Sequence, residues 1–260
     1  MDLTGRKALL TGGAGHIGLS VGEALVELGC KVAILDTATS AGQERVRELC
    51  VIRDASAFFV PCDLRDEAMT RSAMRQIIEK MSGLDILIHC AAYVGTTQAP
   101  GWAVPFEQQT VEAWDAAMRV NVTSAFIMVQ EAREMLAASG HGSVIFFSSI
   151  YGMVGPDYRL YEGTSMQNPV GGGASKGGLL QLTHYLATLL APRVRVNAIS
   201  PGGVWRNQPE PFHQRYISRT PLGRMATEED LKGAVAFLAS DLSKYVTGHN
   251  LVVDGGWTAW

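Results

Sequence analysis

The sequence predicts a doubly wound α/β fold, with a mostly parallel, seven-stranded sheet and helices on both faces. Three observations lead to this prediction. Apolar runs of strand length alternate with amphipathic runs of helix length along all 260 residues. A glycine-rich loop lies between the first strand and the first helix, and an acidic residue follows the second strand. Because no linker or repeat interrupts this order, we expect a single domain over residues 1–260.

The glycine-rich loop is Thr11-Gly-Gly-Ala-Gly-His-Ile-Gly18. Strand, glycine turn and helix in this order are the dinucleotide-binding, or Rossmann, fingerprint. We expect Gly12 to make the tight turn, Gly15 to let backbone N–H groups approach a pyrophosphate, and Gly18 to let the helix pack on the strand. The phosphate then lies at a helix N-terminus, which favours negative charge. The predicted cofactor contacts of the loop are Gly12, Gly15, His16, Ile17 and Gly18.

The second strand ends at Asp36, 18 residues after Gly18. That is about where the ribose-binding acid of a βα unit falls. A carboxylate there accepts hydrogen bonds from the ribose 2′-hydroxyl and repels a 2′-phosphate, so the sequence predicts NAD(H) rather than NADP(H) as cofactor. In the alternative interpretation, Asp36 only caps the following helix.

The elements along the chain keep the same alternation. Strands are expected over residues 8–10, 31–35, 57–60, 84–89, 142–147, 194–199 and 250–253. Helices are expected over residues 19–28, 38–51, 65–81, 110–138 and 174–190, and a further helix begins near Thr227. Since parallel strands end at one edge of a sheet, residues just past the strands are candidates for a binding site.

Several strand ends carry such candidates. Asp63 and Leu64 follow the third strand, where Asp63 either contacts an adenine or caps the next helix. Ala91 follows the fourth strand, and its small side chain lets a cofactor lie against the backbone. Ser149 follows the fifth strand. Asn121 lies inside the expected long helix, where asparagine is a mediocre helix former, and either solvent exposure or a functional role accounts for it.

Composition argues against several classes of function. A net charge of −3 gives no electrostatic reason to expect nucleic acid or an anionic membrane as partner. The N-terminus is polar and no apolar run reaches ~18 residues, so we expect a cytoplasmic protein without a signal peptide. The histidines lack ligand spacing, which predicts no metal site. Buried free thiols are expected at the scattered cysteines, Cys30, Cys50, Cys62 and Cys90.

Taken together, these motifs resemble the short, single-domain branch of the short-chain dehydrogenase/reductase family over nearly the whole chain. Two stretches depart from the family pattern. The glycine spacing is that of the longer branch, and His89-Cys-Ala-Ala stands where Asn-Asn-Ala-Gly is usual. The matching stretches are the glycine loop, Asp36, Asp63-Leu64, Asp85, Asn121, Ser149-Ile-Tyr-Gly152, Ala174-Ser-Lys176, Ser200-Pro-Gly-Gly-Val204 and Val253-Asp-Gly-Gly256.

The resemblance implies an oxidoreductase with a catalytic set of Asn, Ser, Tyr and Lys. In this role Ser149 hydrogen-bonds the reacting oxygen of the substrate. Lys176 holds the nicotinamide ribose and lowers the pKa of a neighbouring phenol. Asn121 keeps a water in place for proton relay, and Val204 presents backbone groups to the nicotinamide carboxamide.

The family's tyrosine is missing from this pattern. It is expected four residues before the lysine, one helical turn away, where this sequence has Gly172. A phenol has an ordinary pKa of about 10 and needs a nearby cation to act near neutrality. Three explanations stay open. Tyr161 or Tyr158 replaces the missing group, or the chain binds its cofactor without chemistry, as a natural or a trapped variant, or water held by Asn121 and Lys176 transfers the proton.

The substrate is a small alcohol or ketone by the same resemblance. Residues 203–225 are rich in proline and aromatic side chains and form a candidate lid, whose Arg206, Arg215 and Arg219 either meet an anionic group or lie solvated. The stretch from Tyr161 to Val170 resembles dehydrogenases of flagellin-glycan and other surface-sugar pathways, which implies a sugar or nucleotide-sugar derivative. A pocket with polar groups and arginine would favour that substrate. A 3-oxoacyl thioester reductase and a noncatalytic NAD-binding regulator are the alternatives.

The family resemblance also implies a homotetramer, with a homodimer as the alternative. The expected helices around Asn121 and after Lys176 carry broad apolar faces. The chain ends in Gly255-Gly-Trp-Thr-Ala-Trp260, an aromatic tail that we expect a monomer to leave exposed to water. Assembly with twofold symmetry would cover these surfaces.

Overall fold

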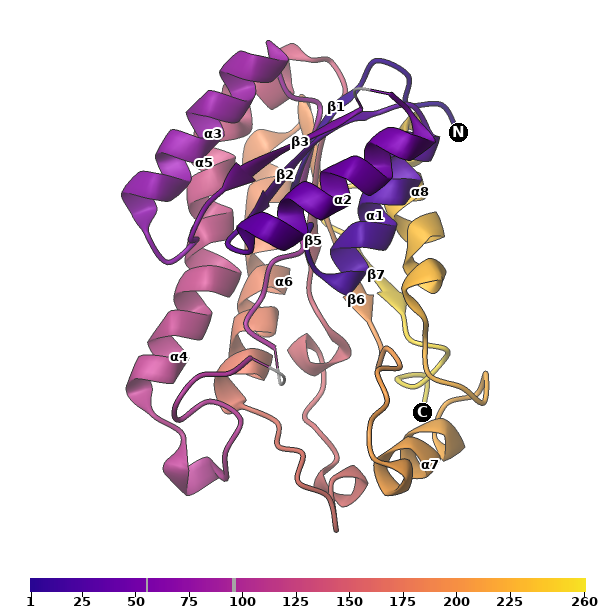
Figure 1. Ribbon diagram of the computed structural model, residues 1–260. Helices are drawn as coiled ribbons and strands as arrows, with labels where there is room; N and C mark the ends of the chain where they lie inside the picture. Colours follow the sequence, from indigo (N-terminus) through magenta and orange to yellow (C-terminus); the bar gives the residue numbers. More distant parts are fainter. Residues whose placement is uncertain (55, 95–96) are drawn as a thin grey trace.

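The computed structural model describes residues 1–54, 56–94 and 97–260. Its strands form one sheet in the order β3-β2-β1-β4-β5-β6-β7 (Figure 1), and every neighbouring pair is parallel. The expected seven-stranded sheet is confirmed, and the strands assigned to it are all parallel rather than mostly so. They are β1 (Lys7–Thr11), β2 (Lys31–Asp36), β3 (Ala57–Pro61), β4 (Ile86–His89), β5 (Gly142–Phe147), β6 (Val194–Pro201) and β7 (Asn250–Val253).

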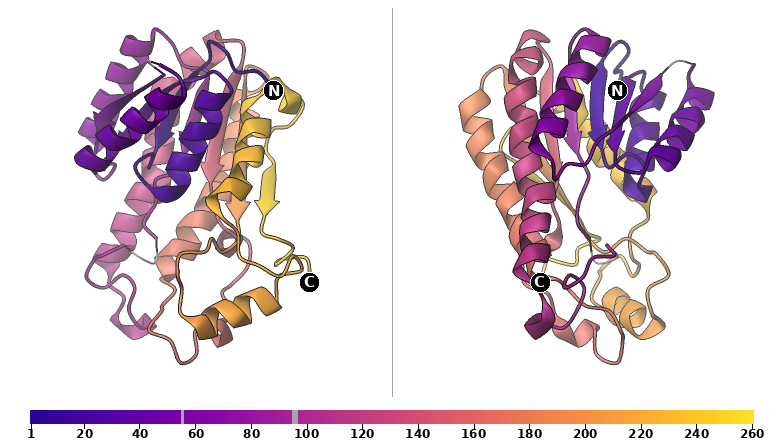
Figure 2. Two further views of the ribbon diagram at one scale, coloured as in Figure 1. Left: turned by 45° about the vertical axis from the view of Figure 1, so that its right-hand side comes forward. Right: turned by 60° about the vertical axis from the view of Figure 1, so that its left-hand side comes forward.

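Helices cover both faces of this sheet, as the doubly wound prediction requires (Figure 2). One face carries α1 (His16–Glu27), α2 (Thr39–Ile52) and α8 (Lys232–Ala239). The other carries α3 (Glu67–Met81), α5 (Ser124–Ala138) and α6 (Val170–Leu190), with α4 (Val111–Met118) extending past the sheet. A further helix, α7 (Glu210–Ser218), lies beyond the carboxyl ends of the strands (Figure 1). The described part of the chain has no helix long and apolar enough to cross a membrane.

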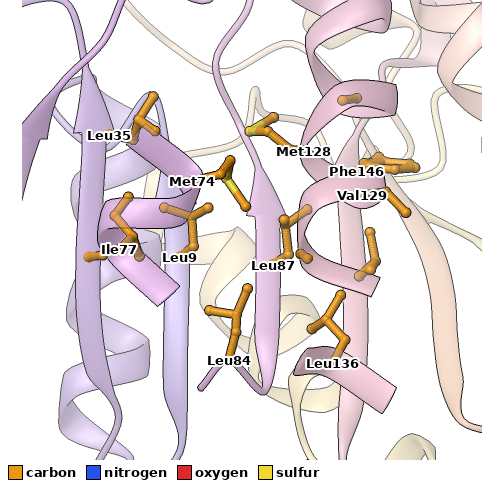
Figure 3. Packing of buried hydrophobic residues seen from close by; sticks show 14 of the residues in the cluster. Leu9, Leu35, Met74, Ile77, Leu84, Leu87, Met128, Val129, Leu136 and Phe146 are labelled. Carbon is orange, nitrogen blue, oxygen red and sulfur yellow. The ribbon is translucent and has the colours of Figure 1, made fainter. Parts of the chain in front are cut away.

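Two apolar layers, one on each face, hold the sheet and the helices together. Leu9 of β1 and Leu87 of β4 face the layer in which Met74 of α3 and Met128 of α5 pack (Figure 3). The next residue, Leu10, points to the opposite layer, beneath α1 and α8. Because both faces are covered, these strands read in the sequence as nearly continuous apolar runs rather than alternating ones.

The start of α3 corrects one sequence-based interpretation. The helix begins at Glu67 rather than at residue 65, and its N-cap is Asp66, whose carboxylate accepts from the Met69 N–H at 2.9 Å. Asp63 therefore does not cap this helix. Its carboxylate instead accepts from the Arg65 guanidinium at 2.6 Å, which holds the pKa of Asp63 below its usual range.

The helix expected over residues 110–138 is interrupted. Thr110 caps α4 by accepting from the Ala113 N–H at 3.2 Å, as an N-cap threonine should. Residues Arg119–Thr123 then form a turn of π-helix, η2, before α5 begins. Such turns are rare and occur mostly as single insertions in α-helices, frequently at functional sites. Asn121 lies within η2 and is fully buried, so its expected alternative of solvent exposure is wrong.

The helix that carries Lys176 begins at Val170 rather than at residue 174, so three consecutive glycines lie in its first turn. Close packing explains why glycine is found there. A Cβ added to Gly171 would lie 3.2 Å from the Trp102 ring and 3.3 Å from the Trp114 ring. One added to Gly173 would lie 3.2 Å from the carbonyl oxygen of Tyr151. The low helix propensity of glycine is thus outweighed by tertiary contact.

The C-terminal tail is not left in water, contrary to expectation. Trp257 is only 4% exposed and stacks on Tyr216, with its ring at right angles to that of Tyr151. Together with Ile150, Leu160, Phe212 and Met225, these rings form a small apolar cluster, here called the lid cluster. The last two residues stay exposed, Trp260 at 76%. The exposed aromatic tail therefore no longer supports the expected assembly.

Candidate functional site

The glycine loop lies at the carboxyl end of β1 and leads directly into α1. Gly12 has a positive φ of 68°, and a Cβ there would lie 2.7 Å from the Ala91 backbone. A Cβ on Gly18 would collide with the carbonyl oxygen of Gly12, so the helix can approach the turn only because residue 18 is glycine. A Cβ on Gly15 would have one neighbour, that same oxygen at 3.3 Å, so no side chain lies close to this part of the loop.

A further glycine of this loop was not singled out from the sequence. A Cβ on Gly13 would lie 2.7 Å from Cγ2 of Ile34, so this residue lets the loop pass closely over β2. The doubled glycine in the sequence was the only available signal, since the contact partner lies on the next strand. His16 opens α1 and Ile17 is partly buried against the layer beneath that helix.

Asp36 ends β2 beside the glycine loop. One carboxylate oxygen, Oδ2, accepts from the Ala14 N–H at 3.1 Å, and the other, Oδ1, accepts from the Ala38 N–H at 3.2 Å. The acid thus bridges the loop and the entry to α2. It is not the N-cap of α2, which is Ala38, although its second contact supports the start of that helix.

Lys176 reaches from α6 to the end of β5. Its ammonium donates to the carbonyl oxygen of Phe147 at 2.6 Å. The residue keeps some exposed surface, but the charged end is enclosed by protein, and this burial lowers the pKa of Lys176 to about 8. Nearby, Ser148 donates to the carbonyl oxygen of Lys176 at 2.8 Å, which fixes the strand end against the helix.

Ser149 lies at the same strand end and remains partly exposed, whereas Ser148 is buried. Its hydroxyl accepts from the Tyr151 N–H at 3.1 Å and caps a short 3₁₀ turn, η3 (Ile150–Gly152). A Cβ on Gly152 would lie 2.8 Å from the carbonyl of Lys176, so η3 packs directly on α6. The fold thereby brings Ser149 and Lys176 to one edge of the sheet.

The amide of Asn121 is occupied by protein groups. Its Oδ1 accepts from the Tyr93 N–H at 2.7 Å, and its Nδ2 donates to the Ser175 hydroxyl at 2.8 Å. Ser175 in turn donates to the carbonyl oxygen of Gly172 at 2.8 Å. The side chain therefore joins the π-turn to the first turn of α6.

Gly172 lies on α6 one turn before Lys176. The nearest side-chain atoms to a Cβ at this position are Cη2 and Cζ2 of Trp102, at 3.8 and 3.9 Å. These are ordinary van der Waals distances, so the backbone here accepts a side chain. Trp102 itself is 2% exposed, and its indole N–H donates to the carbonyl oxygen of Val94 at 2.7 Å.

The tyrosines considered as substitutes belong to the lid cluster and its rim. The hydroxyl of Tyr161 lies 3.0 Å from that of Tyr151 and accepts from Asn168 Nδ2 at 3.0 Å. Burial raises the pKa of Tyr161, which is the opposite of what proton transfer near neutrality requires. Tyr158 is 54% exposed at the surface.

The candidate lid is tied to the rest of the chain by its arginines. Arg206 pairs with Glu228 at 3.0 Å, and the Arg215 guanidinium donates to the carbonyl oxygens of Leu160 and Glu162. Arg219 pairs with Asp157 and lies over the Trp257 ring, 5.0 Å from its centroid. All three side chains thus make contacts within the protein.

The remaining candidate residues take separate positions. Leu64 is buried beneath α3, and the Ala91 N–H donates to the Thr11 hydroxyl at 3.2 Å. Val204 pairs with Ala226 in an isolated bridge, and its carbonyl oxygen accepts from Gln208 Nε2 at 2.9 Å.

A pocket of about 340 Å³ opens beside the first turn of α6. Its hydrogen-bonding side chains are Tyr151, Tyr158 and Asn168. Met153, Val154, Pro156, Pro169 and Val170 supply most of the apolar wall, and arginine is not among the described residues that line it. Its described lining therefore meets only half of the expectation for a sugar substrate, with polar groups but without arginine.

Comparison with known proteins identifies the family. A family model described as enoyl-(acyl carrier protein) reductase matches residues 12–258, which is nearly the whole chain. The chain belongs to the short-chain dehydrogenase/reductase family. This confirms the resemblance drawn from the glycine loop, the serine, the lysine and the C-terminal motifs, and it makes the chain a member of a family of oxidoreductase enzymes.

The relatives within this family act on different substrates by name. A 2,5-dichloro-2,5-cyclohexadiene-1,4-diol dehydrogenase of Sphingobium indicum is 32% identical, over 98% of this chain and 97% of its own length. A probable galactose dehydrogenase of Rhizobium meliloti is 31% identical, over 98% and 96%. A 3-oxoacyl-acyl-carrier-protein reductase of Aquifex aeolicus is 29% identical, over 98% of both chains. The family is therefore shared while the substrate differs.

Solved structures agree with the fold and differ in cofactor. A putative short-chain alcohol dehydrogenase from Sinorhizobium meliloti superimposes with a TM-score of 0.88 at 31% identity, covering 99% of this chain and 98% of that one. An NAD⁺-bound xylitol dehydrogenase gives 0.87 at 26%, covering 98% and 100%. An NADPH-dependent 3-quinuclidinone reductase from Rhodotorula rubra gives 0.86 at 27%, covering 100% and 93%. Solved structures of this fold thus include an NAD⁺-bound and an NADPH-dependent enzyme.

Proposed function

We propose that this short-chain dehydrogenase/reductase binds NAD(H) and a small alcohol or ketone at the carboxyl edge of its sheet, and that glycine at position 172 weakens proton transfer there. The observation that carries the proposal is that Ser149 and Lys176 both lie at the carboxyl end of β5, with Gly172 one helical turn before Lys176 on α6. Gly172 lies where the family has its phenol, and Trp102 is the nearest side chain to that position.

The residues present fit a dinucleotide. Only glycine at positions 12 and 18 allows this tight turn, because a Cβ at either would collide with backbone, and a Cβ at Gly15 would meet only the carbonyl oxygen of Gly12. Lys176 carries a buried ammonium that would meet a ribose hydroxyl. When bound, NAD(H) supplies or accepts the hydride, and the protein's part is to hold both reactants together.

The choice of NAD(H) over NADP(H) rests on Asp36. Its carboxylate lies at the end of β2 next to the loop, with Oδ2 held by the Ala14 N–H. A negative charge there repels a 2′-phosphate and accepts from a 2′-hydroxyl. The remaining cofactor contacts that we propose are those of the loop together with Asp63, Leu64, Ala91 and Val204.

Within this site Ser149 would donate to the reacting oxygen of the substrate. Lys176, with its pKa lowered to about 8, is charged at neutral pH and would favour developing negative charge beside it. Asn121 would position α6 through Ser175, since its amide is already bonded. With Tyr161 bonded inside the lid cluster, we propose that slow proton transfer by water is the residual route.

The substrate we favour is a sugar or another polyol. The galactose and cyclohexadiene-diol dehydrogenases among the relatives take hydroxylated rings by name, and the pocket beside α6 offers two phenols and an amide for hydrogen bonds. A 3-oxoacyl thioester is the rival substrate, supported by the similarity to the Aquifex reductase. We further propose a cytoplasmic homotetramer, in one domain.

Titration with cofactor and a substrate panel tests these proposals. NADH should quench tryptophan fluorescence with an affinity well above that of NADPH. Turnover should be slow and confined to polyols and sugars rather than acyl thioesters. Tight NADH binding without turnover of either class would support the noncatalytic regulator, and failure to bind either nucleotide would refute the proposal.

A further inference from the structure

A continuous path of buried hydrogen bonds begins at the glycine loop. The Ala91 N–H donates to the Thr11 hydroxyl oxygen at 3.2 Å, and that oxygen lies 2.9 Å from Nδ1 of His89. The other ring nitrogen, Nε2, lies 3.2 Å from the carbonyl oxygen of Asn121. Thr11, His89 and Asn121 have no exposed surface, so these bonds lie in the interior between β1, β4 and the π-turn.

The same path continues to α6. The Asn121 amide donates to Ser175 at 2.8 Å, and the Ser175 hydroxyl donates to the carbonyl oxygen of Gly172 at 2.8 Å. Ser175 is likewise fully buried. The hydrogen bonds therefore run unbroken from the turn that would hold the pyrophosphate to the helical turn just before Lys176.

The chemistry of the groups fixes the direction of each bond. A carbonyl oxygen only accepts, so His89 Nε2 carries the proton and donates to Asn121. Nδ1 is then the acceptor, and the Thr11 hydroxyl donates to it while accepting from Ala91. Burial, together with the nearby Lys176 charge, lowers the pKa of His89 to about 3, so the imidazole stays neutral.

We propose that His89 is a positioning residue that holds the first turn of α6, and with it Lys176, at a fixed distance from the glycine loop. The imidazole is the only side chain among the described residues of this path that spans from β1 to the π-turn. This inference rests on the proposed binding of NAD(H). It adds that the hydrogen bonds through His89 fix the distance between the glycine loop and Lys176 before the dinucleotide binds.

A fixed distance between the glycine loop and Lys176 matters only for a ligand that contacts both. In the proposed site, the adenosine half meets the loop and Asp36, whereas the nicotinamide ribose meets Lys176. When one half of the dinucleotide binds, the other half meets its own contact at a high effective concentration. Breaking the hydrogen bonds through His89 should therefore weaken the binding of the whole dinucleotide and leave the binding of its adenosine half alone unchanged.

The experiment compares NADH with 5′-AMP by calorimetric titration. His89→Leu removes both imidazole bonds, and Ser175→Ala breaks the path at its far end. We expect each to weaken NADH about 10-fold, the scale of a lost buried hydrogen bond, and to change the affinity for 5′-AMP by less than about twofold. His89→Gln, whose amide has N–H donors and a carbonyl acceptor, should recover part of the NADH affinity.

Thr183→Val is the matched control. Thr183 is a buried residue of α6 whose hydroxyl donates to the Leu179 carbonyl oxygen at 2.8 Å, outside the path. It should change neither affinity. If leucine at position 89 prevents folding, Ser175→Ala still tests the proposal. Unchanged NADH affinity in Ser175→Ala, or equal weakening of NADH and 5′-AMP in the folded variants, would overturn it. A wild-type protein that binds no NADH would instead overturn the proposed function.

Discussion

In the proposed site, the absence of a side chain at position 172 limits catalysis and leaves binding intact. Ser149 and Lys176 were predicted from the sequence as site residues, and the structure brings both to the end of β5. The sequence did not predict how Lys176 is held, because its partner is a backbone carbonyl on a distant strand. It also left Asn121 open, since burial in a π-turn depends on contacts with Tyr93 and Ser175 that no local pattern records.

The first prediction concerns the missing phenol. Gly172→Tyr should raise turnover by at least ~100-fold, the usual contribution of a positioned acid or base. The backbone accepts the change, because the nearest side chain to a Cβ is Trp102 at 3.8 Å. Steady-state assays with NAD(H) and one polyol measure the effect.

Gly172→Phe is the control for that substitution, since it adds the ring without the hydroxyl and should give no rescue. The competing explanation assigns the role to Tyr161. It requires Tyr161→Phe to abolish activity in the unmodified protein and tyrosine at 172 to add little. Rescue by phenylalanine would show that packing, not proton transfer, was limiting.

The second prediction concerns cofactor choice. Asp36→Ala should weaken NAD(H) binding by about 1–2 kcal/mol, the scale of a charge-assisted hydrogen bond, and should relax discrimination against NADP(H). Asp36→Asn keeps a carbonyl oxygen for the Ala14 N–H but loses the charge, so it should relax discrimination with a smaller loss of NAD(H) affinity. Equal affinity of the wild type for NADH and NADPH would rule out this role for Asp36.

The third prediction follows from the buried ammonium of Lys176. Its pKa falls from the ordinary 10.5 to about 8 in the folded protein. Between these values the unfolded chain binds a proton that the native protein does not, so this residue makes stability rise with pH across that window. Its destabilising effect is complete below about pH 8 and is gone above the unfolded value.

Lys176→Met removes this dependence. Buried thiols and phenols with raised pKa values act in the opposite direction at high pH, among them Cys62 at about 11 and Tyr216 at about 12. The measurement is therefore the difference in unfolding free energy between the two proteins, from urea titrations at pH 7 to 10.5. The advantage of methionine should shrink as pH rises, and a constant difference would contradict the lowered pKa.

At the scale of elements, the sequence predicted the strands well and several helix boundaries poorly. Strands that are buried on both faces are recognisable in the sequence as short apolar runs, and all seven predicted strands are present in the structure. The first turn of α6 was missed because glycine argues against a helix, and only the closeness of Trp102 and Trp114 reverses that preference. The π-turn was missed because the apolar pattern continues through it.

The fourth prediction concerns the lid. Arg219 joins the end of α7 to Asp157, so Arg219→Leu should free α7 and make residues 203–225 roughly threefold or more easier to cleave in limited proteolysis. Arg159 pairs with the same carboxylate from two residues away and spans no elements. Arg159→Leu should therefore leave cleavage unchanged, and equal effects of both variants would contradict a tie across the lid.

At the scale of the whole molecule, the remaining question is how many copies act together. The lid cluster covers Trp257, so assembly must be argued from the helices alone. Phe126 of α5 and Leu189 of α6 are 45% and 61% exposed, and large exposed apolar groups on neighbouring helices are typical of contact surfaces. They are consistent with the homotetramer that we propose.

The fifth prediction tests that assembly. Light scattering at micromolar concentration should give the mass of a tetramer, and Phe126→Glu with Leu189→Glu should lower it by placing charge in the contact. Val51→Glu is the control, because Val51 is 87% exposed on α2, on the opposite face of the sheet. A monomeric wild type would exclude the tetramer.

The lid cluster has a consequence for how the protein folds. It joins three stretches that lie far apart along the chain, residues 150–166, residues 212–225 and Trp257. Contacts of such long sequence separation cost more loop-closure entropy than the local contacts within a helix. The lid is therefore completed only when distant parts of the chain have come together.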